Sequence, residues 1–138
     1  EYLIPFGQAK ILREGTDVTI VANLLMVHKS LLAAKSLGEA GIEAEVIDVR
    51  TLVPFDWQTL FDSVGKTGRL VIVEEDNLTG GWGAEVAARV ADSCIGFLQG
   101  PIKRVAAPDT PVPFAPVMEN YYIPSVERII ETVKQLMA

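Results

Sequence analysis

The chain has 138 residues, 49% of them hydrophobic, and its 12 Lys and Arg side chains against 18 Asp and Glu leave a net charge of −6. This length suits one domain with a sizeable core, and the acidic balance argues against a nucleic-acid-binding module or a domain that binds anionic membranes. The single cysteine rules out an intrachain disulfide framework, and the pattern predicts neither a targeting peptide nor a membrane span of about 20 apolar residues.

The first half of the chain alternates strand and helix patterns. Residues 9–13 are a short strand candidate, and the β-branched run 18–22 is typical of a strand buried on both faces. Apolar side chains at helical spacing predict a helix over residues 26–40, and residues 44–49 form the next strand.

The second half continues the alternation. Asp56 is a plausible N-cap for a helix that begins at Trp57 and ends near Gly65–Gly68. We expect a buried strand over 70–73, the longest helix over 83–98, a short strand over 103–106 and a final helix over 124–137 that Ser125 caps. The proline-rich residues 108–116 read as an extended loop too apolar for a free tether, so we expect it to pack on a surface.

This order predicts the fold class. Strands that alternate with helices indicate an α/β fold with a three-layer arrangement: a mostly parallel sheet with helices on both faces. No internal repeat, low-complexity tract or interdomain linker interrupts residues 1–138, so we expect a single domain.

The turn at Gly80, Gly81, Trp82 and Gly83 follows a buried strand and leads into a helix. Backbone N–H groups at a helix start attract anions, so the turn is a weak candidate for an anion site. It is neither G-x-G-x-x-G nor a P-loop, and carboxylates stand just before it. We therefore favour a tight strand-to-helix turn that presents Trp82 to a neighbouring surface.

Other polar candidates have weak signals. Glu74, Glu75 and Asp76 could form a carboxylate cluster, but neighbouring strand residues point to opposite faces, so a solvated strand end is favoured. His28, the only histidine, stands just beyond a strand end where α/β folds bind ligands, yet a position on a helix surface or at an interface is favoured. Cys94 lies on an apolar helix stripe and is expected to be inert packing.

Aromatic side chains near the end of the chain suggest a contact surface. Phe114, Tyr121 and Tyr122 lie close to the apolar residues 112–117 and could form an exposed apolar patch, which often marks a protein interface. Read from its residues alone, the chain is an α/β domain with no convincing catalytic set.

Several segments together carry a resemblance to a known family. They are residues 4–10, 13–21, 45–56, 103–105, the Thr-Gly-Gly-Trp-Gly-Ala-Glu stretch at 79–85 and the Ala-Pro-Asp-Thr-Pro-Val-Pro stretch at 107–113. In this order and spacing the chain resembles the C-terminal domain of the beta subunit of thiamine-diphosphate-dependent 2-oxoacid dehydrogenases. These are the pyruvate, branched-chain 2-oxoacid and acetoin dehydrogenases of the transketolase-like superfamily.

The resemblance implies a five-stranded, mostly parallel sheet with one antiparallel edge strand, which we assign to residues 9–13. It also implies that an upstream pyrimidine-binding domain and the alpha subunit hold thiamine diphosphate, magnesium and the catalytic groups. No catalytic, cofactor or metal residue is therefore assigned to this chain, and His28 is not matched to the family's catalytic histidine.

The resemblance further implies partners. The expected ones are the pyrimidine-binding domain, the alpha subunit, a second beta subunit and the acyltransferase core, with no nucleic acid and no membrane. Docking of that core often uses carboxylates before the Lys103–Arg104 strand, but residues 99–102 contain no acid. The turn at residues 23–26 is also more apolar than a ligand-binding turn of this family.

We therefore expect an assembly domain of an enzyme that decarboxylates a 2-oxoacid and transfers the acyl group to lipoamide, in the cytoplasm or the mitochondrial matrix. A chain that opens at Glu1 without an initiator Met suggests a processed product or an excised domain, and we expect a domain excised from a longer subunit, inactive alone. One alternative is a stand-alone binding module that reuses the fold. Another is part of a transketolase-like enzyme acting on sugar phosphates.

Overall fold

The fold is built on one five-stranded sheet. A computed structural model describes residues 2–138. The strands are β1 (Lys10–Arg13), β2 (Val18–Ala22), β3 (Ala44–Asp48), β4 (Leu70–Asn77) and β5 (Lys103–Ala107). Their spatial order is β1-β3-β2-β4-β5, with β1 antiparallel to β3 and every other pair parallel. The predicted mixed sheet and its antiparallel edge are confirmed.

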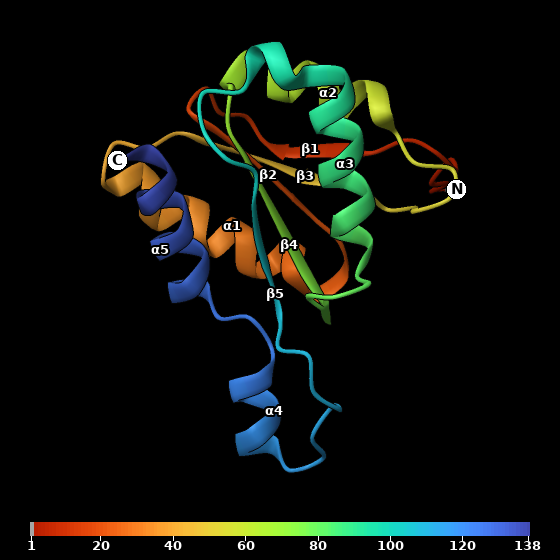
Figure 1. The fold of residues 1–138 in the computed structure, drawn as a ribbon, viewed down its shortest axis with the longest axis vertical. Coiled ribbons are helices and arrows are strands. Elements are labelled where there is room, and N and C mark those ends of the chain that lie inside the picture. The colour runs from red at the N-terminus through yellow and green to blue at the C-terminus, as the bar shows by residue number, and fades with distance from the viewer. Residues whose placement is uncertain (1) are drawn as a thin grey trace.

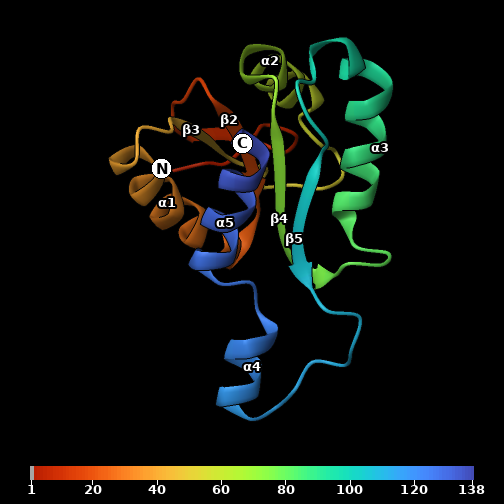
Figure 2. The same ribbon diagram turned by 60° about the vertical axis from the view of Figure 1, so that its left-hand side comes forward.

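Helices cover both faces of this sheet (Figures 1 and 2). They are α1 (Leu24–Glu39), α2 (Trp57–Thr67), α3 (Trp82–Cys94), α4 (Pro116–Tyr122) and α5 (Val126–Met137), with a short 3₁₀ turn at Ile95–Phe97. Helices α1 and α5 lie on one face, and α2 and α3 lie on the other. The three-layer α/β architecture follows, as predicted.

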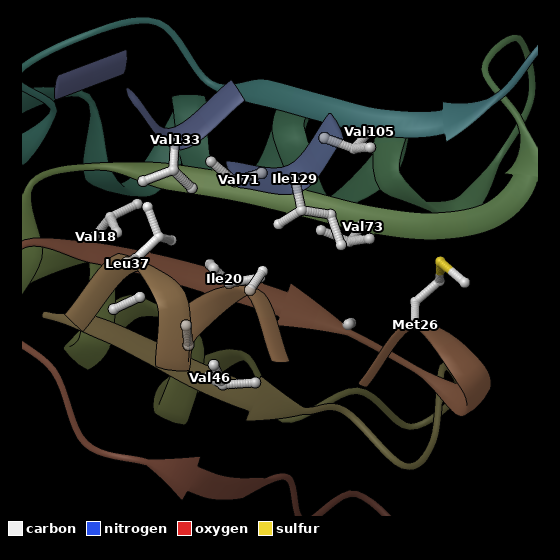
Figure 3. Close-up of a cluster of buried hydrophobic side chains, with 14 of the residues drawn as sticks. Val18, Ile20, Met26, Leu37, Val46, Val71, Val73, Val105, Ile129 and Val133 are labelled. Carbon is white, nitrogen blue, oxygen red and sulfur yellow. The ribbon is translucent and has the colours of Figure 1, made fainter. Parts of the chain in front are cut away.

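Two apolar clusters lie between these layers. Alternate residues of β2 and β4, such as Ile20 and Val71, meet Ile129 and Val133 of α5 and Leu37 of α1 (Figure 3). The intervening strand residues, such as Val21 and Ile72, pack under α2 and α3. Because both strand faces are buried, the central strands are continuous apolar runs rather than alternating ones.

Local sequence signals fix several helix ends. The Asp56 side chain accepts the Thr59 N–H at 3.2 Å and caps α2, and the Ser125 hydroxyl accepts the Arg128 N–H at 3.1 Å and caps α5. Helix α2 ends at Gly68, whose φ of +67° suits glycine. Both predicted N-caps are therefore confirmed.

Three expectations about the elements are wrong. The longest helix is the 16-residue α1, because the helix that begins at Trp82 gives way at Cys94 to the 3₁₀ turn. Strand β4 continues to Asn77, so the three acidic residues lie within it and not beyond it. The proline-rich loop is followed by a helix, α4, which begins at Pro116 where proline fits a first helical turn.

The segment at residues 108–123 projects away from the sheet, and we call it the arm. It leaves the carboxyl end of β5, contains α4 and returns to α5 (Figures 1 and 2). Most of its residues from 111 to 121 are exposed within this chain, so the expected packing of the proline-rich loop on a surface stays a prediction. Over residues 2–138, helices long and apolar enough to cross a membrane are absent.

Candidate functional site

The end of β4 holds a buried carboxylate that sequence reasoning placed in solvent. Glu74 has no exposed surface, and its carboxylate accepts hydrogen bonds from the Gly83 N–H at 2.8 Å and from Arg104 Nε at 3.0 Å. Arg104 is itself mostly buried and pairs with Glu74 from the adjacent strand β5. The predicted solvated strand end is thus wrong for Glu74, because Arg104 and the start of α3 neutralise its charge. Glu75 is half-buried, and Asp76 is exposed.

The glycines of the following turn are shaped by this carboxylate. A Cβ atom at Gly81 would lie 2.7 Å from Glu74 Oε2, and one at Gly83 would lie 2.5 Å from Glu74 Oε1. Neither position can carry a side chain without moving Glu74. Glu74 therefore takes the place at the α3 N-terminus that an external anion would need.

Trp82 also packs partly into the interior of the domain. Its ring is half-buried and packs on the apolar cluster under α2 and α3, and its expected contact with a neighbouring surface stays a prediction. Gly80 has a φ of +81° and open space where its Cβ would stand. The Gly80–Gly83 turn is a structural joint between β4 and α3.

His28 lies exposed on α1, in agreement with a helix-surface position. It borders a depression of about 690 Å³ at the carboxyl ends of β2 and β3, with Asp48, Arg50 and several leucines. Arg50 and Leu24 both have positive φ values there, 58° and 49°. The walls are mostly apolar and give His28 no nucleophile to activate.

Metal and thiol chemistry find no support in residues 2–138. Within that range there is no group of three or more His, Cys, Asp or Glu side chains placed to hold a metal ion. Cys94 is buried, as predicted, and burial raises the pKa of its thiol. A raised pKa lowers the thiolate fraction at neutral pH, which suits packing rather than nucleophilic attack.

The arm carries several strongly exposed apolar side chains. Phe114 is fully exposed, Tyr121 is 91% exposed and Val117 is 83% exposed. Tyr122, expected in the same exposed patch, is buried at 5% exposure and lines the base of the arm's groove instead. Between residues 108–113 and α4 runs an almost wholly apolar groove of about 620 Å³.

Polar contacts hold the arm at both of its ends. At its start, Asp109 accepts the Thr79 N–H at 2.8 Å and the Thr79 hydroxyl at 2.6 Å. At its end, Lys29 of α1 donates to the Pro124 carbonyl at 2.8 Å. The anchored arm thus presents its apolar tip in a fixed direction. This geometry suits a protein contact better than chemistry.

The chain matches a known protein family and several curated proteins. The model of the family described as "Transketolase, C-terminal domain" matches residues 7–129. Curated relatives include the beta subunit of acetoin:2,6-dichlorophenolindophenol oxidoreductase from Cupriavidus necator, which is 46% identical over 136 residues. The pyruvate dehydrogenase E1 component subunit beta from Bacillus subtilis is 43% identical over 137 residues. The matches cover 99% of this chain but only 40% and 42% of those proteins.

A solved structure agrees with these relatives. The chain superposes on a "split gene transketolase, inactive beta4 tetramer" with a TM-score of 0.85 and 31% sequence identity, covering 99% of this chain and 43% of that one. The chain thus spans about two fifths of the length of the proteins that it matches.

Proposed function

The chain belongs to the transketolase C-terminal domain family, and we propose that it is the assembly domain of the beta subunit of a 2-oxoacid dehydrogenase. The parent enzyme would decarboxylate a 2-oxoacid with thiamine diphosphate and pass the acyl group to lipoamide. Support comes from curated relatives named as the beta subunits of acetoin:2,6-dichlorophenolindophenol oxidoreductase, 2-oxoisovalerate dehydrogenase and pyruvate dehydrogenase.

The α3 N-terminus does not fit the diphosphate of thiamine diphosphate. A diphosphate needs free backbone N–H groups or cationic side chains, and its magnesium needs carboxylate or carbonyl oxygens. The glycine turn at the α3 N-terminus is filled by the Glu74 carboxylate. We therefore derive no catalytic step within residues 2–138 and place the chemistry in other parts of the parent enzyme.

The observation that carries this proposal is the anchored apolar arm. Its side chains Phe114, Val117 and Tyr121 are exposed to water. Covering this apolar surface with a partner lowers the free energy, so it favours association. In the parent enzyme the pyrimidine-binding domain, the alpha subunit or a second beta subunit would cover the arm. A similar solved structure, titled a beta4 tetramer, supports self-association of such subunits. The cytoplasm or the mitochondrial matrix is the compartment we propose.

The proposal is tested by reading the coding sequence upstream of Glu1 and producing the whole subunit with its alpha partner. We expect thiamine-diphosphate-dependent decarboxylation of pyruvate or a branched-chain 2-oxoacid, or cleavage of the carbon–carbon bond of acetoin, by the assembled enzyme, and no such activity by the 138-residue chain. Phe114→Ser together with Tyr121→Ser should weaken assembly and leave the fold of the domain intact. Decarboxylation by the chain alone, or a native protein that begins next to Glu1, would reject the proposal.

A further inference from the structure

Two apolar features lie at the same edge of the sheet, where the parallel strands end. The arm leaves the carboxyl end of β5 (Figures 1 and 2). The depression beside His28 lies at the carboxyl ends of β2 and β3 and reaches Leu12 of β1. The strand order β1-β3-β2-β4-β5 places these two features on opposite sides of the sheet. One edge of the domain thus carries both a projection and a hollow.

The walls of the depression are mostly apolar and open to water. Its volume of about 690 Å³ is large enough to enclose an aromatic side chain. Five of the leucine and isoleucine side chains that line it are exposed, namely Ile4, Leu12, Leu24, Leu25 and Leu52. An exposed apolar surface of this extent is typical of a protein contact.

The charged groups of the arm are all acidic. Residues 108–123 hold two carboxylates, Asp109 and Glu119, and no Lys, Arg or His. Asp109 accepts two hydrogen bonds from Thr79. Glu119 is exposed on α4, and its side chain forms no hydrogen bond or ion pair with residues 2–138. The arm therefore offers one free carboxylate next to its exposed apolar side chains.

The depression holds the complementary charge. Arg50 lines it and is half-buried. The backbone N–H of Arg50 donates to Asp48 Oδ1 at 3.0 Å, but its guanidinium has no hydrogen-bond or ion-pair partner in the described part of the chain. A half-buried guanidinium gains free energy from a carboxylate partner. The apolar hollow therefore contains a cation that suits the free carboxylate of the arm.

We propose that the arm of one chain docks in the depression of a second copy, and that the exchange is reciprocal. A two-fold axis roughly normal to the sheet, placed beyond the middle of this edge, brings the arm side of each copy over the depression side of the other. Phe114 then meets the leucine walls, and Glu119 faces Arg50 of the other copy. This inference rests on the function proposed above, because it names a second beta subunit as the partner that covers the arm.

The apolar area of the arm suits a stable dimer. An aromatic side chain buries about 150–250 Å², so Phe114 and Tyr121 offer roughly 400 Å² on each arm. Two arms together with the surfaces that they cover would then bury about 1,600 Å², the standard size of a specific interface. A second copy accounts for both features at once, because each chain supplies one arm and one depression, and the two-fold contact closes at two chains.

The first test is sedimentation equilibrium of the 138-residue chain at low salt. We expect a dimer whose dissociation constant rises at least tenfold with Phe114→Ser and several-fold with Glu119→Arg or Arg50→Glu. The double variant Glu119→Arg with Arg50→Glu exchanges the two charges and should recover most of the affinity. Glu131→Arg, an equal charge change at an exposed position of α5, is the matched control and should dimerise as the original chain does. A chain that stays monomeric up to about 1 mM, a Phe114→Ser variant that dimerises normally, or a double variant no tighter than the single ones would overturn the proposal.

The second test locates the contact between copies. A Phe114→Cys chain is mixed with a Leu25→Cys chain and treated with a short bismaleimide, while Cys94 is buried and protected from the reagent. We expect cross-linked pairs that contain one chain of each kind, and far fewer when Glu131→Cys replaces Leu25→Cys. Equal cross-linking in the two mixtures would reject the depression as the docking site. These tests need neither cofactor nor substrate, so a monomeric chain beside an active assembled enzyme would reject this docking and leave the proposed function in place.

Discussion

Gly83 and Glu74 lie nine residues apart in sequence, and the Glu74 carboxylate occupies the space that a side chain on Gly83 would need. The Gly83 N–H donates to the Glu74 carboxylate at 2.8 Å, and a Cβ on Gly83 would lie 2.5 Å from Glu74 Oε1 and 2.9 Å from the Ile72 side chain. The joint between β4 and α3 therefore requires both residues. The glycine turn, the most conspicuous motif of the sequence, follows from a buried carboxylate rather than from a ligand.

We predict that Gly83→Ala destabilises the domain by about 2–4 kcal/mol, because Glu74 must move away from Arg104 and α3 to make room. Gly65→Ala is the matched control: Gly65 also lies in a helix, α2, but has open space where its Cβ would stand. That change should stabilise by up to ~1 kcal/mol through helix propensity. Urea unfolding of the two variants measures both, and equal stability would contradict the prediction.

This joint also shows where sequence reasoning stops. The β-branched run of β2 was predicted with its observed bounds because a strand buried on both faces leaves a local signature. The burial of Glu74 depends on Arg104, thirty residues later, and on the parallel register that places Arg104 opposite Ile72. No local pattern encodes that register. Three acidic residues in a row therefore looked solvated, although one of them is fully buried.

The arm also shows a limit of sequence reasoning, here among residues close together in the chain. A cluster of prolines predicted irregular structure, but Pro116 lies in the first turn of α4, where it disrupts nothing. Once α4 forms, neighbouring residues point about 100° apart, so Tyr121 is exposed and Tyr122 is buried. Without the helix, both tyrosines were assigned to one exposed patch.

The Glu45–Lys66 pair predicts how stability depends on pH. Burial pushes the pKa of Glu45 upward, but hydrogen bonds from the side chains of Lys66 and Ser63, with a smaller one from the Gly15 N–H, outweigh it and hold the pKa below its ordinary value of 4.5. A carboxyl group with a lowered pKa in the folded state adds stability above its unfolded pKa and loses it as pH falls through the folded pKa. Urea unfolding between pH 7 and pH 3 should show this acid loss. Glu45→Gln should show less of it, and an identical pH slope in the variant would refute the assignment.

Asp56 is predicted to join two elements through one carboxylate. It caps α2 through the Thr59 N–H, and its Oδ2 atom accepts the Ala9 N–H at 2.9 Å, just before β1. Asp56→Ala should destabilise by about 1–2 kcal/mol, the usual cost of a lost N-cap. Asp56→Asn keeps a capping oxygen and should recover much of that loss. Hydrogen exchange should show faster opening at Ala9 in the alanine variant, and protection equal to that of the original chain would count against the joint role.

Substitutions of the two neighbouring tyrosines of the arm should distinguish effects on folding from effects on assembly. Tyr122 is buried at 5% exposure, so Tyr122→Ala should cost about 2–4 kcal/mol, as truncation of a buried aromatic does. Tyr121 is 91% exposed, so Tyr121→Ala should change the unfolding free energy by less than about 0.5 kcal/mol.

In the whole subunit, Tyr121 should matter for assembly. Tyr121→Ala should slow or weaken assembly, because an aromatic side chain at an interface contributes strongly to binding when it is covered. Sedimentation of the assembled enzyme and thermal unfolding of the chain measure the two effects separately. If Tyr121→Ala left assembly unchanged, the arm would not be the contact surface, even if the tyrosines differed in folding as predicted.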